Sequence, residues 1–182
     1  MPSQTTHSSG AKYSLTLGVA EEANFLGEMY YSRSKFFGVS SGQYKDIIIE
    51  VGDKDVFIVG RSFSVSTDRL EIDVFVGPTF TGGAVIPIQP YNGITPVAPA
   101  KSLGWFDPVV TSSGTLFDEF LILGSPDNNS SRVGGAFRQD EALRMIPANT
   151  TFLIRFRNEG TIDMDAIVKY LFFERKAGRP PI

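Results

Sequence analysis

Acidic residues stand next to one another at three places in the sequence, and paired carboxylates are the groups that could act as general acid and general base. The pairs are Glu21/Glu22, Asp118/Glu119 and Asp140/Glu141. Neighbouring residues of a β-strand point to opposite faces of the sheet, so Asp118 and Glu119 cannot share one site if they lie in a strand. We therefore interpret the three pairs as solvated surface charges and expect no catalytic site.

Other residues that perform chemistry are scarce. The 182 residues include no Cys and a single His, His7, which lies in a leader rich in Ser and Thr. The lack of Cys excludes disulfides, thiolate zinc sites and cysteine nucleophiles, and a lone His nearly excludes a Ser-His-Asp triad. Residues 127–130 (DNNS) offer oxygen ligands of the kind that calcium prefers, but they lack the spaced acids and the closing Glu of a calcium loop, and a turn is favoured. We expect no metal and no cofactor.

The charge balance argues against nucleic acid and anionic membranes as partners. Seventeen Lys and Arg against 20 Asp and Glu leave a net charge of -3, which provides no basic surface for nucleic acid or for an anionic membrane. No apolar run approaches the ~18 to 20 residues of a membrane-spanning helix, and the first ten residues do not follow a signal-peptide pattern. We expect a protein made in the cytoplasm that binds neither nucleic acid nor membrane.

The elements that must position these residues are short β-strands from Tyr44 onward. Residues 45–51 and 55–59 are rich in β-branched side chains and are separated by Gly52-Asp53-Lys54, which predicts a hairpin. In residues 69–76 apolar and acidic side chains alternate, which is typical of a strand with one buried and one solvated face.

The remainder of the chain continues this pattern. Residues 78–99 hold several Pro and Gly residues and predict a long excursion with edge strands. Further strands are expected at 105–111, 115–123, 133–138, 151–157 and 165–174. The Gly134-Gly135 pair is expected at a turn or bulge. The last run, 166–174, is apolar on both faces except at Lys169 and predicts a central strand, with an amphipathic helix as the competing interpretation.

Two arginines should face outward from the strand at 151–157. Apolar side chains alternate there with Arg155 and Arg157, which leaves the arginines on the face away from the core. They could pair with acids of an adjoining subunit, or with Glu71 or Asp73 of the same chain.

Short strands spaced by about 8 to 12 residues indicate an all-β, antiparallel β-sandwich or barrel, and about eight strands favour a jelly roll. We divide the chain into a flexible N-terminal arm at 1–43 that could hold a short helix, a β-sandwich at 44–176 and a tail at 177–182. The arm is rich in aromatic residues but has no self-contained core, so it must pack either on its own body or over a neighbouring subunit. The side chains expected to bind a partner are Phe25, Tyr30, Tyr31, Phe36, Phe37, Tyr91, Trp105, Arg155 and Arg157.

Short motifs between Tyr44 and Arg175 resemble those of β-rich structural proteins of tailed-bacteriophage virions. They are 141–158 (EALRMIPANTTFLIRFRN), Gly114-Thr115-Leu116, Gly134-Gly135, 76–79 (VGPT) and 171–174 (LFFE). Several of those proteins are jelly-roll decoration, or cement, proteins that sit as trimers on icosahedral heads and brace the major capsid subunits. The resemblance implies a non-enzymatic protein of the virion head surface whose partners are the major capsid protein and, in a homotrimer, itself.

Two other functions remain open from the residues. Trp105 and Tyr91 could form an aromatic platform for a sugar ring, which would suit a carbohydrate- or receptor-binding module of a phage tail or fibre. Packing in the core is the favoured interpretation of Trp105. A glycosidase would need two cooperating carboxylates, and the sequence does not bring two together.

Overall fold

The computed structural model describes residues 4–6, 12–14, 23, 26–92, 99–123, 133–137 and 144–176. The regular elements of these residues are all β-strands, and every pairing is antiparallel, which confirms the all-β class. In chain order they are β1 (Gln4–Thr6), β2 (Lys12–Ser14), β3 (Met29–Val39), β4 (Tyr44–Glu50), β5 (Lys54–Val65), β6 (Arg69–Val76), β7 (Thr79–Thr81), β8 (Ala84–Ile86), β9 (Ile88–Pro90), β10 (Leu103–Phe106), β11 (Val109–Ser112), β12 (Thr115–Leu123), β13 (Val133–Phe137), β14 (Arg144–Ile146), β15 (Thr151–Asn158) and β16 (Met164–Lys176). No helix of this part of the chain is long and apolar enough to cross a membrane.

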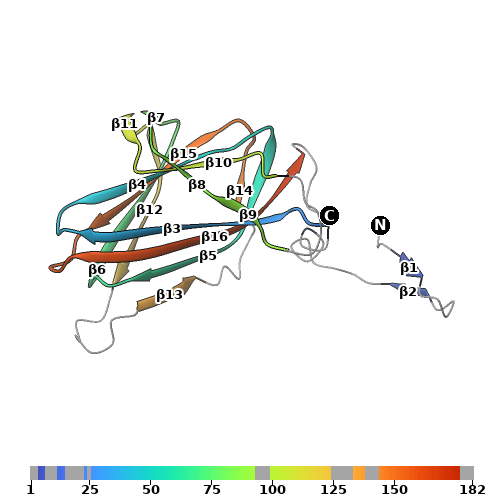
Figure 1. Ribbon diagram of the computed structural model, residues 1–182, viewed down its shortest axis with the longest axis horizontal. Coiled ribbons are helices and arrows are strands. Elements are labelled where there is room, and N and C mark those ends of the chain that lie inside the picture. The colour runs from blue at the N-terminus through green and yellow to red at the C-terminus, as the bar shows by residue number, and fades with distance from the viewer. Residues whose placement is uncertain are drawn as a thin grey trace.

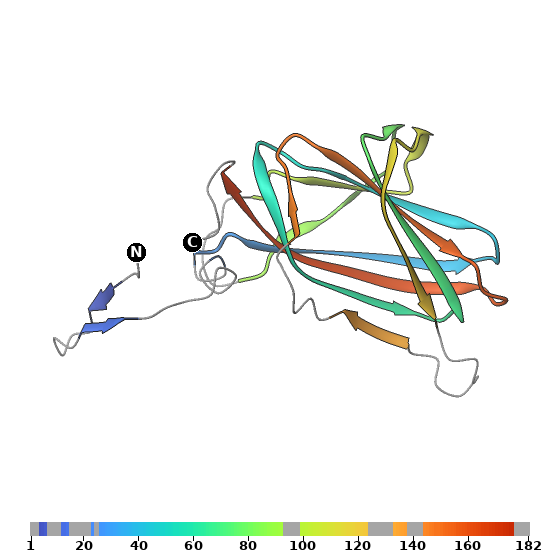
Figure 2. The same cartoon turned by 180° about the vertical axis from the view of Figure 1, so that it is seen from behind.

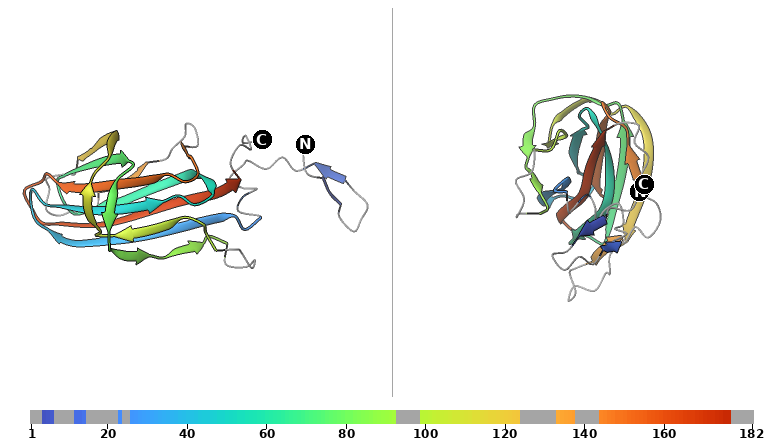
Figure 3. Two further views of the ribbon diagram at one scale, coloured as in Figure 1. Left: turned by 90° about the horizontal axis from the view of Figure 1, so that it is seen from above. Right: turned by 90° about the vertical axis from the view of Figure 1, so that its right-hand side faces the viewer.

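Two six-stranded sheets pack face to face as a sandwich (Figures 1 and 2). The first has the order β12-β6-β15-β4-β10-β8. The second has the order β13-β5-β16-β3-β9, with β14 also paired to β5. The short strands β7 and β11 form a separate pair, and β1 and β2 form another that lies away from the sandwich (Figure 3). The antiparallel β-sandwich expected from the strand spacing is therefore present.

The chain alternates between the sheets. Strands β3, β4, β5 and β6 cross from one sheet to the other at each step, and so do β12, β13, β15 and β16. Strands β7 to β11 lie between β6 and β12 in the chain, and β8 and β9 each form one of the two edges of a sheet. The edge strands predicted within residues 78–99 are confirmed for the part that the structure describes.

β16 lies between β5 and β3, so the prediction of a central strand at 166–174 is confirmed and the helical alternative is wrong. Gly134 and Gly135 lie within β13, paired with Ser64 and Phe63 of β5, rather than at a turn. The strand expected at 105–111 is split into β10 and β11 at Asp107, which has a positive φ of 51° and donates its N–H to the Asp46 carbonyl at 2.9 Å.

The hairpin expected around Gly52 does not form, because β4 and β5 belong to different sheets. The connection between them is held by the turn before β15 instead. The Val51 N–H donates to the Thr150 carbonyl at 2.8 Å, and the Asn149 N–H donates to the Gly52 carbonyl at 2.8 Å. A Gly-Asp-Lys turn is equally compatible with a corner between sheets, so the local sequence could not distinguish the two.

β3 belongs to the sandwich, whereas the sequence placed residues 29–39 in an arm. It pairs with β16 on one side and with β9 on the other. Its inward face carries Tyr30, Ser32, Ser34 and Phe36, all of them buried. The two serines hide the apolar alternation that would otherwise have identified a buried strand.

The apolar core lies between the two sheets. Its largest cluster contains Phe36, Phe63 and Phe156, with ring centroids 5.0 Å apart for Phe36 and Phe156 and 6.3 Å apart for Phe63 and Phe156. A smaller cluster lies around Tyr30, Val51, Val56 and Phe172. Side chains on the inward faces of both sheets thus supply the apolar burial that stabilises the sandwich.

A buried polar residue joins the loops at one end of the sandwich. Asn158, at the end of β15, is 0% exposed. Its Nδ2 donates to the carbonyls of Val39 and Ile162 at 2.8 and 2.7 Å, and its Oδ1 accepts from Thr67 Oγ1 and from the Gly160 N–H at 2.7 and 3.1 Å. All polar atoms of this amide are therefore satisfied by three separate segments.

Candidate functional site

An apolar surface runs along β12, which forms the edge of the first sheet opposite to β8. Its residues are Leu116, Phe117, Leu121 and Leu123, which are 51%, 66%, 44% and 66% exposed, and we call them the β12 edge surface. Among the described strands, β12 pairs only with β6, so its outer side presents unpaired backbone groups beside these side chains. Sheet edges of this length are usually protected by charge, by Pro or by a covering segment.

Strand alternation and a bulge explain why these side chains are exposed. Phe120 and Ile122 point inward and pack on the core, so Leu121 points to the outer face of the sheet. The register shifts between Leu116 and Asp118, and the extra residue, Phe117, meets the Phe152 ring edge-on at a centroid distance of 6.1 Å. The strand is thus apolar on both faces, although only one of them faces the core.

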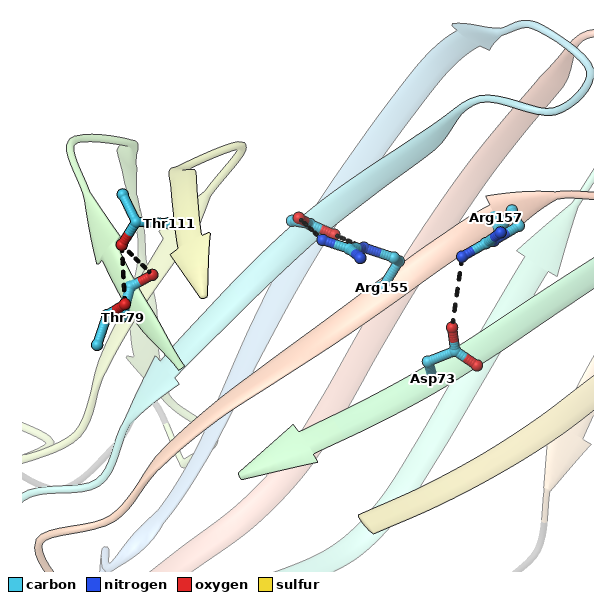
Figure 4. Close-up of polar contacts among 6 residues, drawn as sticks. Asp73, Thr79, Thr111, Arg155 and Arg157 are labelled. Atoms are coloured by element: carbon cyan, nitrogen blue, oxygen red, sulfur yellow. Dashed lines mark hydrogen bonds and ion pairs between the residues drawn. The ribbon is translucent and has the colours of Figure 1, made fainter. Parts of the chain in front are cut away.

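Arg155 is bound within its own chain. Its Nε and Nη2 donate to the two carboxylate oxygens of Asp46, both at 2.9 Å, from directly opposite positions on β15 and β4 (Figure 4). The guanidinium also lies over the Tyr44 ring, 4.2 Å from its centroid. The hydrogen bond to Asp46 raises the pKa of the Arg155 guanidinium above its ordinary value. Both side chains are largely buried. The charge of Arg155 is therefore paired inside the chain and is not accessible to a partner, contrary to the expectation from the sequence.

Arg157 pairs more loosely, and with one of the two acids named from the sequence. Its Nη2 lies 3.9 Å from Asp73 Oδ2 (Figure 4), and its Nε lies 3.7 Å from Glu159 Oε1. Burial raises the pKa of Asp73, while the charge of Arg157 opposes that shift. The expected pairing of Arg157 with Asp73 of the same chain is therefore present, and the Arg157 side chain remains partly exposed.

The aromatic residues of the predicted arm that were expected to bind a partner differ in their exposure. Tyr30 and Phe36 are 3% and 1% exposed, so they are core residues and that expectation is wrong for both. Tyr31 is partly buried and donates its hydroxyl to Gln89 Oε1. Phe37 is 70% exposed and remains a candidate contact residue. Phe25 lies outside the described residues.

Trp105 and Tyr91, which the sequence allowed as a sugar platform, lie at strands of different sheets. Trp105 is on β10, where its Nε1 donates to Glu50 and its ring packs on Phe80 of β7 at a centroid distance of 6.2 Å. β7 is joined to β11 by Thr79 and Thr111, whose hydroxyls are 2.8 Å apart (Figure 4). Tyr91 follows β9 at the edge of the other sheet and is about half exposed. The interpretation of Trp105 as a packing residue agrees with these contacts.

No cluster of metal ligands is present in the described part of the chain: no three His, Cys, Asp or Glu side chains gather there. Asp118 and Glu119 lie in β12, where the Glu119 N–H donates to Asp118 Oδ1 at 3.1 Å. The pair Glu21/Glu22, the pair Asp140/Glu141 and the turn at 127–130 lie outside the described residues.

The β12 edge surface was missed from the sequence. Residues 115–123 (TLFDEFLIL) are apolar on both faces, but this pattern also fits a strand covered on both sides. Only the strand order places them at an edge. No protein-family model matches the sequence, and comparisons with curated proteins and with solved structures find no similar chain.

Proposed function

We propose that this chain is a non-enzymatic structural protein of a tailed-bacteriophage virion, a decoration or cement protein that binds the major capsid protein on the head and stabilises its lattice. The observation that carries the proposal is the β12 edge surface. It combines four exposed apolar side chains with an unpaired strand edge, and such a surface is suited to contact with another protein.

The physical case is that of an apolar interface. Burial of Leu121 and Leu123 against a partner would remove apolar area from water, at roughly 25 cal/mol per Å². Backbone groups on the outer side of β12 could pair with a strand of that partner at the same time. Three copies joined as a homotrimer would make such contacts together, and multivalency then strengthens binding without any new contact.

The strand order supports the finer assignment of the sandwich as a jelly roll. β3-β16-β5-β13 adjoin in one sheet and β4-β15-β6-β12 in the other, and the chain alternates between the sheets. Eight strands in two such sheets are the pattern that the term denotes. The motifs that resemble phage decoration proteins, among them 141–158 and 171–174, are the further support for the virion setting.

The test uses heads that lack this protein. We expect the purified chain to co-sediment with them and to raise the temperature at which they release DNA. Leu121→Asp with Leu123→Asp should abolish co-sedimentation, because two charges would be buried without partners. Val109→Asp is the matched control, since Val109 is as exposed as Leu123 and lies on β11, which pairs with β7 and not with β12.

Two results would contradict the proposal. One is an unchanged bound amount for the Leu121/Leu123 variant while its circular dichroism spectrum matches that of the wild type. The other is no binding of the wild type to heads at any concentration up to the micromolar range. Light scattering coupled to gel filtration tests the homotrimer separately, with a mass of three chains expected.

A further inference from the structure

A cavity of about 940 Å³ lies between the two sheets. Its walls are mainly apolar side chains from both layers, among them Ile49, Val74 and Ile154 of the first sheet and Ile58 and Phe172 of the second. Folded interiors are close-packed and contain few voids larger than a water molecule. A volume of this size instead matches the ~300 to 1,000 Å³ of small-molecule sites.

The cavity reaches the surface on the side where β12 and β14 lie. Leu116, Phe117 and Met145 line it and are each more than half exposed, so they form its mouth. Val56 and Arg61, which also line it, are five positions apart on β5, which corresponds to roughly 16 Å at ~3.3 Å per residue. The space is therefore long enough for an extended apolar chain.

Within the described part of the chain, one polar atom of the cavity wall has no hydrogen-bond partner. Ser102 is 3% exposed and lines the cavity, and its Oγ makes no hydrogen bond with the described residues. Buried hydroxyls are nearly always paired, because an unsatisfied one is destabilising. A hydroxyl left in this state at the wall of an apolar cavity is suited to a hydrogen bond with a bound molecule.

The surroundings of Ser102 select the charge of that molecule. The Ser102 N–H donates to Glu174 Oε1 at 2.8 Å, and the Lys101 N–H donates to Glu174 Oε2 at 2.8 Å. Glu174 is 1% exposed, so its carboxylate is buried close to Ser102. A second anion next to it would be repelled in a medium of low dielectric, whereas a neutral oxygen would not.

We propose that the cavity binds a neutral single-chain lipid, of the fatty-alcohol class, with its hydroxyl on Ser102 Oγ and its alkyl chain between the sheets. Arg61 and Tyr170 face each other on β5 and β16 at the other end of the cavity wall and do not take part in holding the hydroxyl. This proposal does not rest on the proposed contact with capsids, although Leu116 and Phe117 line the cavity and also belong to the β12 edge surface.

The probes are 1-dodecanol and dodecanoate, which have the same chain length and differ in charge. Each is titrated into the full chain loaded with the fluorescent apolar dye N-phenyl-1-naphthylamine. We expect the alcohol to displace the dye at least tenfold more effectively than the carboxylate at pH 8. Ser102→Ala should raise the dissociation constant of dodecanol roughly 2- to 10-fold, the range for one neutral hydrogen bond, and leave dye binding unchanged. Ser40→Ala, at an exposed position, is the control.

A second variant fills the cavity. Ile58→Trp should abolish dye and dodecanol binding, whereas Val85→Trp, at an exposed position outside the cavity lining, should not. Ser102→Ala should also leave the thermal midpoint of the free protein unchanged or slightly raised, because it removes an unpaired hydroxyl. Three results would overturn the proposal: no dye binding, equal displacement by alcohol and carboxylate, or an unchanged dodecanol affinity in Ser102→Ala. A cavity occupied by a second copy of the chain would give the first of these.

Discussion

The buried amide of Asn158 should be a large single contributor to stability. Replacement by Ala removes four hydrogen bonds, to Thr67, Gly160, Val39 and Ile162, and leaves their partners unsatisfied in the interior. Each such bond contributes about 0.5 to 1.5 kcal/mol net, and partial relaxation brings the total for Asn158→Ala to about 3 to 4 kcal/mol. This is a large part of the ~5 to 15 kcal/mol that stabilises a typical domain.

Urea unfolding measures this loss. The signals are far-UV circular dichroism and the fluorescence of Trp105, the single Trp of the chain. With a slope of about 2 kcal/mol per molar urea, the midpoint should fall by roughly 1.5 to 2 M. Gln43→Ala, an exposed side chain in the same loop region, should change the free energy of unfolding by less than about 0.5 kcal/mol.

A double-mutant cycle with Thr67 separates the amide from its surroundings. Thr67→Val removes one of the four hydrogen bonds and should cost about 1 kcal/mol alone, but much less in the Asn158→Ala background. The reasoning is refuted if Asn158→Ala lowers the free energy of unfolding by less than about 1 kcal/mol, or if the two substitutions are additive.

Three further predictions follow from local contacts. Gly160→Ala would place a Cβ 2.1 Å from both Asp68 Oδ1 and Thr67 Oγ1, so these side chains must move, and we expect a lower thermal midpoint in calorimetry; an unchanged midpoint would contradict the clash. Arg155→Lys cannot reproduce the two-point contact with Asp46 and should lower the free energy of unfolding by about 1 to 2 kcal/mol in urea, whereas rescue of wild-type stability by Lys would show that charge alone matters. Burial raises the pKa of Asp73, so the folded state favours the protonated form of this carboxyl. Its contribution to stability is complete below the ordinary pKa of an aspartate and is lost as the pH rises through the raised pKa of Asp73. Asp73→Asn should therefore gain stability relative to the wild type between about pH 3 and pH 7, and urea midpoints that keep a constant difference across that range would disprove it.

The strands that the sequence predicted well are those whose apolar pattern matches their place in the fold. β6 and β15 alternate and have an inward apolar face, and β16 is apolar on both faces and is central. β3 was not predicted as a strand of the sandwich, because Ser32 and Ser34 occupy two of its inward positions and interrupt the apolar pattern. The Asp46 partner of Arg155 could not be found either, because the register of β4 against β15 is a property of the whole sheet.

Contact surfaces depend on topology even more strongly. Tyr30 and Phe37 are both aromatic residues of β3, yet one is buried and the other is exposed, which follows from alternation once the strand is recognised. The exposure of the β12 leucines could not be predicted in this way, because nothing in residues 115–123 distinguishes an edge strand from a central one. The cavity has no local signal at all, because its lining residues come from nine strands and the turns between them.

The two proposed sites meet at one side of the sandwich. Leu116 and Phe117 belong to the β12 edge surface and also form the mouth of the cavity with Met145. A protein that covers all of β12 would therefore close the route by which a lipid enters or leaves, without touching Ser102. Capsid binding should then slow the release of dodecanol, and by linkage can change its affinity only if the cavity itself changes shape. Release from bound and free protein, compared by dye exchange, distinguishes these cases: a slower rate with an unchanged dissociation constant indicates a covered mouth, and equal rates indicate that the partner leaves Leu116 and Phe117 open.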